Sequence, residues 1–119
     1  MTVQPLLILF LLFTKHFLAD FPLQTPYMLR KTAENGWVKP LLLHAGVHAI
    51  LTCSVLCYFT GFQEAVLLSG LDFLAHLTID AWKARLTNYP ISDKRFWWAF
   101  GFNQWLHALT YLQIAYLVS

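Results

Sequence analysis

Four apolar segments divide this chain of 119 residues, and each approaches the length of a membrane-crossing helix. A hydrocarbon core of roughly 30 Å requires about 20 consecutive apolar residues in a helix. Hydrophobic residues make up 58% of the sequence and charged residues 12%, which is too apolar for a soluble domain of this size. The sequence therefore predicts one all-α integral membrane domain, a four-helix bundle with spans at about 4–21, 40–60, 63–82 and 96–118.

The basic residues predict the orientation of this bundle. All eight lie within or close to two of the three predicted loops, residues 22–39 and 83–95. The positive-inside rule places both long loops in the cytoplasm and both termini outside. The formal net charge is only +2, and contact with anionic lipid head groups accounts for it without a nucleic acid. The eight residues are Lys15, Arg30, Lys31, Lys39, Lys83, Arg85, Lys94 and Arg95.

The third segment carries three ionisable residues spaced four apart, Asp72, His76 and Asp80. On a helix these side chains lie along one face. Ionisable groups within a membrane span are costly, so they usually face the protein interior and have a function. The same spacing recurs at the end of the first segment, in His16 and Asp20.

The second and fourth segments place further polar residues at the same predicted depth. His44 and His48 lie near the start of the second segment, and Asn103, Gln104 and His107 lie in the first half of the fourth. The first segment ends on the side of the membrane where the second begins, and the third and fourth are related in the same way. All five histidines are therefore expected in the cytoplasmic half of the bundle.

The two halves of the chain share a pattern, in which an HxxxD pair is followed by a basic loop and an (H/N)xxxH pair. The HxxxD pair recurs at an offset of 60 residues and the second pair at an offset of 59. Two hairpins in the same orientation would be related by a pseudo-twofold axis along the membrane normal. Asp72 has no counterpart, because Leu12 occupies the matching position. The matched residues are His16 and Asp20 with His76 and Asp80, and His44 and His48 with Asn103 and His107.

The converging residue types predict a metal site inside the bundle. Imidazole nitrogen and carboxylate oxygen bind Zn²⁺, Fe²⁺ and Mn²⁺, and ligands on facing helices can close such a site. We expect one or two divalent metal ions per chain, with zinc favoured over iron or manganese. Asn103 and Gln104 are expected to hydrogen-bond the ligands, as Asp20 and Asp80 could in a one-metal site. The candidate ligands are His16, Asp20, His44, His48, His76, Asp80 and His107.

Two interpretations without a metal remain open for the same residues. A buried network of histidines and aspartates could relay protons across part of the membrane. It could also serve only to hold the helices together.

The motifs resemble a family of small multi-pass membrane proteins of bacteria and their phages, classified as a domain of unknown function. The resemblance rests on residues 16–21 and 23–25, on the HxxxH and HxxxD pairs, and on the Asn-Gln pair three residues before His107. Asn103 stands where that family often has an acidic residue. The resemblance implies a bacterial inner (cytoplasmic) membrane. A looser similarity to bacterial inner-membrane proteins labelled metal-dependent hydrolases implies hydrolysis.

The leading functional hypothesis is a metal-dependent hydrolase. A bound divalent metal would lower the pKa of a bound water to about 7 and polarise the scissile group. Asp72 or Asp80 is the expected catalytic base. Lys15, Arg30 and Lys31 could hold an anionic or lipid-like substrate near the membrane interface.

Other classes of protein fit the same pattern. A transporter or carrier of a metal ion or small solute, which could be a homo-oligomer, needs polar groups through the full bilayer. Residues 49–59 are nearly all apolar, which favours a one-sided site. A non-catalytic accessory membrane protein is a third hypothesis. A di-iron oxidase is a fourth, although membrane proteins of that class use more histidines than the five present here.

Overall fold

The protein is all-α. The computed structural model describes residues 3–118, and within this range the chain forms four α-helices and one short 3-10 helix, with no strand. The α-helices are α1 (Gln4–Asp20), α2 (Val38–Leu56), α3 (Phe62–Leu86) and α4 (Lys94–Val118), and the 3-10 helix η1 (Met28–Thr32) lies between α1 and α2. The predicted all-α class and the four predicted helices are confirmed.

Two helix ends differ from the predicted spans. α2 ends at Leu56 instead of near residue 60, because the next residues form a turn in which the Thr60 N–H donates to the Leu56 carbonyl (3.0 Å). α3 continues to Leu86 instead of ending near residue 82. Its last turn contains Lys83 and Arg85, and positive charge is favourable at the C-terminal end of the helix dipole.

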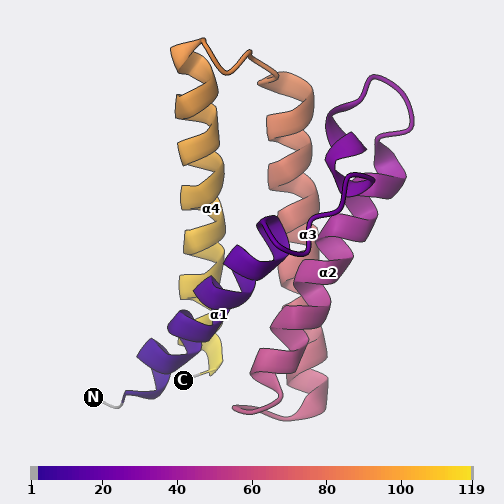
Figure 1. The fold of residues 1–119 in the computed structure, drawn as a ribbon. Coiled ribbons are helices and arrows are strands. Elements are labelled where there is room, and N and C mark those ends of the chain that lie inside the picture. Colours follow the sequence, from indigo (N-terminus) through magenta and orange to yellow (C-terminus); the bar gives the residue numbers. More distant parts are fainter. Residues whose placement is uncertain (1–2, 119) are drawn as a thin grey trace.

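The helices form two hairpins around a shared interior. α2 packs against α3, α4 packs against α3, and α1 crosses the bundle obliquely in contact with α2 and α4 (Figure 1). The two long connections lie towards one end of the bundle. The start of α1, the end of α4 and the turn between α2 and α3 lie at the other (Figure 1). The end of α1, the first halves of α2 and α4, and the second half of α3 can therefore meet inside the bundle.

A hydrophobic core fills the interior towards the start of α1 and the end of α4. It is built on fully buried side chains that include Ile8, Leu12, Leu56, Tyr111 and Ile114. These residues come from α1, α2 and α4, and Ala65 of α3 completes the contact. This end of the bundle is consequently packed with apolar side chains.

Two helices, α2 and α3, are long and apolar enough to cross a membrane by length and composition. α1 has 17 residues, and α4 has 25 residues but is less apolar than α2. Many large apolar side chains face outward, for example Phe10 at 64%, Leu67 at 75% and Trp98 at 76% exposed. Such a surface suits lipid better than water. These features indicate a membrane protein.

Candidate metal centre

The predicted polar residues of all four helices meet in the interior of the bundle. The imidazoles of His44, His48, His76 and His107 and the carboxylate of Asp72 are each at most 2% exposed. They are accompanied by Asp20, Asp80, His16 and the amide of Asn103. The convergence that the spacing predicted is therefore present.

The first cluster is the Asp20 group, which we define as Asp20, His44 and His48. The Oδ1 atom of Asp20 lies 2.8 Å from Nε2 of His48 and 3.1 Å from Nε2 of His44. Nε2 of His16 lies 3.0 Å from the other carboxylate oxygen. A carboxylate only accepts hydrogen bonds when it is ionised, so these ring nitrogens act as N–H donors. Asp20 is thus surrounded by three imidazole N–H groups.

The second cluster is the Asp80 group, which we define as His76, Asp80 and His107. The Oδ1 atom of Asp80 lies 3.0 Å from Nε2 of His107, and the Asn103 side-chain amide donates to the same oxygen at 2.9 Å. Nδ1 of His76 lies 3.7 Å from Oδ2. Asn103 and His107 thus contact Asp80 much as His44 and His48 contact Asp20, in line with the internal repeat.

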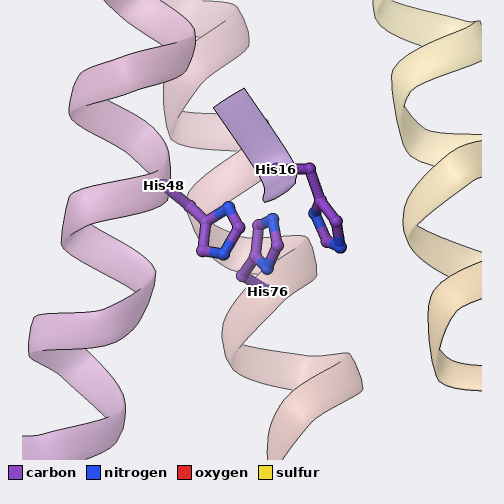
Figure 2. Close-up of side chains that lie close together, drawn as sticks. All are labelled: His16, His48 and His76. Carbon is purple, nitrogen blue, oxygen red and sulfur yellow. The ribbon is translucent and has the colours of Figure 1, made fainter. Parts of the chain in front are cut away.

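The imidazole rings lie against one another between the helices. Figure 2 shows His16, His48 and His76, from three different helices, gathered in the interior. The ring centroids of His48 and His76 are 3.8 Å apart, and those of His76 and His107 are 4.0 Å apart. The stacking holds each ring in a fixed orientation.

Distances and donor types allow a metal ion in this cluster. In the Asp20 group and in the Asp80 group, one ligand atom per residue can be chosen so that all lie within 4.8 Å of one another. Tetrahedral zinc with bonds of about 2.0–2.1 Å needs ligand atoms roughly 3.3 Å apart, and the observed pairs bracket this value. The same distance criterion is met by His16, His48 and His76.

Hydrogen bonding distinguishes the two groups. His16 and His48 use Nε2 as a donor to Asp20, and their Nδ1 atoms face the Tyr111 hydroxyl (2.6 Å) and the Lys15 ammonium (3.0 Å). In the Asp80 group, Nδ1 of His76 and Nδ1 of His107 are buried without a hydrogen-bond partner among the described residues. Buried polar atoms rarely lack a partner. Nδ1 of His44 is also buried without a partner among the described residues, so the Asp80 group offers two unpartnered ring nitrogens to a cation and the Asp20 group offers one, whereas His16 and His48 are already bonded at both ring nitrogens.

Lys15 and Asp72 form a buried ion pair that the sequence did not reveal. Nζ of Lys15 lies 3.1 Å from Oδ2 of Asp72, and the Thr52 hydroxyl donates to the same oxygen at 2.6 Å. Lys15 was expected to bind substrate, but it is 3% exposed and is not among the residues that line the cavity described below. Asp72 was expected as a base, yet it faces Lys15 and lies 3.3 Å from Nε2 of His76 through its Oδ1 atom.

Tyr111 belongs to the site but was not among the residues predicted from the sequence. Its hydroxyl lies 2.6 Å from Nδ1 of His16 and 3.2 Å from Nε2 of His76. In its neutral form the His76 ring donates from Nε2 to the Tyr111 hydroxyl, with Oδ1 of Asp72 at 3.3 Å from the same nitrogen, and Nδ1 is then the acceptor. A usable signal existed, because Tyr111 follows His107 by four residues and must share its helix face.

A cavity of about 340 Å³ reaches the cluster from the end of the bundle that carries the long connections. Its lining includes Asp20, His44 and Asp80 from the cluster, together with Lys31 and Lys83. Burial holds the pKa of Lys31 below its ordinary value, although the nearby carboxylates of Asp80 and Asp20 act to raise it. The polar cluster is therefore accessible from one side.

The remaining predicted residues occupy different places around this cavity. Asn103 and Gln104 line it, and the Gln104 amide donates to Oδ1 of Asn103 (3.0 Å) while its Oε1 lies 2.9 Å from Nε2 of His16. Lys31 lines it as well, but Arg30 is exposed and lies over the ring of Tyr27. Of the three predicted substrate-binding residues, only Lys31 is thus placed at the cavity.

The fold and the site define an all-helical protein with two membrane-length helices and a buried cluster of histidines and aspartates. The sequence profile of a family described as "Protein of unknown function (DUF3307)" matches residues 8–119. The chain belongs to this family, and the resemblance that its motifs indicated is confirmed. No curated protein and no solved structure matches the chain.

Proposed function

We propose that this protein crosses the bacterial inner membrane four times and is a hydrolase that depends on one divalent metal ion. α2 and α3 support the membrane assignment by their length and composition, and α1 and α4 carry outward-facing apolar residues such as Phe10 and Leu112. The basic residues flanking the long connections favour their placement in the cytoplasm. The metal would then lie below the cytoplasmic face.

The observation that carries the proposal is the pair of unpartnered ring nitrogens in the Asp80 group. Nδ1 of His76 and Nδ1 of His107 lack partners among the described residues, and the carboxylate of Asp80 lies next to both rings. Two histidines and one carboxylate form a common ligand set of catalytic zinc. Asp72 and Tyr111 hold the opposite nitrogen of His76, as partners of metal-binding histidines typically do.

The charges of the buried cluster favour one divalent ion over two. Asp20, Asp72 and Asp80 carry three negative charges when ionised, and Lys15 carries one positive charge, which leaves −3 + 1 = −2. Uncompensated buried charge is strongly unfavourable. One divalent cation neutralises the cluster, whereas two would leave an excess of two positive charges.

The residues around the cavity suit hydrolysis. A divalent ion bound there would lower the pKa of a coordinated water to about 7 and polarise the scissile group. His44 lines the cavity, and its Nε2 donates to Asp20. We assign its Nδ1, which is buried and has no partner among the described residues, as the acceptor of the proton that the attacking water loses. That proton passes to the leaving oxygen, so that one water is consumed for each bond broken.

The apolar core favours a hydrolase over a carrier. The cavity opens at the end with the long connections, whereas Ile8, Leu12, Leu56 and Ile114 pack the interior towards the other end. A transport path needs polar groups or water on both sides of its binding site. A one-sided cavity above a buried metal is instead the arrangement that a hydrolase requires.

The test is hydrolysis of chromogenic p-nitrophenyl carboxylate and phosphate esters by the purified full-length protein in detergent. We expect zinc-dependent turnover that is lost in His76→Ala together with the bound metal. His44→Ala should lose turnover but retain the metal. Glu34→Gln, which changes an exposed carboxylate, is the matched control and should behave as wild type. Turnover that is equal in all four proteins would contradict the proposal.

A further inference from the structure

Two lysines line the same cavity from different elements. Lys31 belongs to η1 and Lys83 to the last turn of α3. The Lys31 ammonium donates to Oε1 of Gln24 at 2.8 Å, which fixes it at the cavity wall. The Lys83 ammonium lies 5.6 Å from the ring centroid of Phe100, another residue of the lining. The lining of the cavity thus combines two lysines with the carboxylates of Asp20 and Asp80.

Neither lysine has a partner of opposite charge at contact distance. Within residues 3–118, neither Lys31 nor Lys83 lies within 4.0 Å of a carboxylate oxygen in an ion pair, although both side chains are partly buried. Partly buried ammonium groups that face one cavity without an ion pair create a site for an anion. Lysine commonly binds phosphate groups in proteins, where its ammonium acts as a point charge.

We infer that this cavity binds a phosphate monoester group, between Lys31 and Lys83 and above the Asp80 group. The inference rests on the proposed function through its count of charges. The buried cluster of Asp20, Asp72, Asp80 and Lys15 is neutral once the proposed divalent ion is bound, so Lys31 and Lys83 add two uncompensated positive charges at the cavity. A phosphate monoester is close to a dianion at neutral pH and restores the balance, whereas a carboxylate or a phosphodiester supplies only one charge.

The cavity wall also offers apolar contacts to the rest of the ligand. Phe21, Leu29 and Phe100 line the cavity, and all three are also exposed beyond it. A ligand whose phosphate enters the cavity can therefore lay an apolar portion against these side chains. The phosphate monoester group can belong to a soluble molecule or to the head group of a membrane lipid.

The experiment is isothermal titration of the purified full-length protein in maltoside detergent, after removal of unbound metal. The three titrants are inorganic phosphate, dihexanoyl phosphatidic acid and dihexanoyl phosphatidylcholine. The cavity variant is Lys31→Gln/Lys83→Gln. Its matched control is Lys39→Gln/Lys94→Gln, which removes two exposed charges outside the cavity. A third variant, Lys31→Arg/Lys83→Arg, keeps both charges, and circular dichroism verifies that each variant is folded.

We expect the cavity variant to bind both phosphate and phosphatidic acid at least about tenfold more weakly, since two charge-assisted contacts are lost. The control and the arginine variant should stay within about twofold of wild type. If phosphatidic acid binds about tenfold more tightly than phosphate, the ligand is lipid-borne; equal affinities indicate a soluble phosphate. Equal weakening in the cavity and control variants, or binding of phosphatidylcholine as tight as that of phosphatidic acid, would overturn the inference.

Elemental analysis of the same preparations separates this inference from the proposed function. Bound metal together with phosphate affinity that does not depend on Lys31 and Lys83 removes the inference and leaves the metal site. The opposite result is protein that takes up no metal but binds phosphate through both lysines. That result would retain the phosphate site and rule out the metal-dependent function.

Discussion

Lys15 and Asp72 form an ion pair inside the bundle, with 3.1 Å between Nζ and Oδ2. Neither residue has a charged counterpart in the other half of the chain. Ala75 lies 60 residues after Lys15, and Leu12 lies 60 residues before Asp72. The first half of the chain therefore contributes a buried cation and the second half a buried anion. The two departures from the repeat compensate each other through an ion pair that joins α1 to α3.

This ion pair should be essential to stability when only one partner is removed. We expect Lys15→Met to destabilise the folded protein by about 3–5 kcal/mol, because Asp72 would remain buried without its counter-charge. The double variant Lys15→Met/Asp72→Leu should be less destabilised than Lys15→Met alone. Thermal unfolding in detergent measures both changes, and Lys39→Met, at an exposed position, is the control. A double variant that is at least as destabilised as Lys15→Met alone would contradict the assignment.

The Tyr111 hydroxyl should support metal binding without touching the ion. Its contacts with His16 and His76 fix both rings, so Tyr111→Phe should lower metal affinity by about 10–100-fold while the fold is retained. Competition with a chromogenic chelator measures the affinity. Tyr116→Phe is the matched control, because that side chain is 80% exposed. Equal affinities for the two variants would mean that the hydroxyl has no role at the site.

The orientation in the membrane can be tested with single thiols. Cys57 is exposed at the turn between α2 and α3, so in Cys53→Ala it should react with a membrane-impermeant maleimide added to intact spheroplasts. A cysteine introduced as Asn88→Cys, in a background of Cys53→Ala/Cys57→Ser, lies in the connection between α3 and α4. It should react only after permeabilisation. Labelling of both positions from the same side would rule out an α3 that crosses the membrane.

The spacing of the histidines was sufficient to predict much of the candidate site. Residues four apart share a helix face, and the alternating direction of the helices brings these faces to one depth. The sequence analysis expected Lys15 to bind substrate near the membrane interface because of its charge and its position in the chain. Its helix buries Ile8, Leu12, Lys15 and Ala19, a spacing that assigns the lysine to the interior face.

Other features could not be predicted from the pattern alone. The four-residue spacing places Thr52 on the helix face of His48 and Tyr111 on that of His107, but only the packing of four helices decides which partner each side chain meets. The difference between the two aspartate groups depends on which ring nitrogen faces which neighbour, which no spacing rule specifies. The short helix η1 places Lys31 at the cavity, and the sequence indicated only a polar loop there.

Metal content is the decisive measurement for the proposed site. The full-length protein, purified in detergent and loaded in turn with zinc, iron and manganese, is measured by elemental analysis. The account predicts about one equivalent of zinc per chain in wild type, in Glu34→Gln and in His44→Ala, and its loss in His76→Ala and in His107→Ala. Wild-type protein that remains free of metal under all three loading conditions would contradict it.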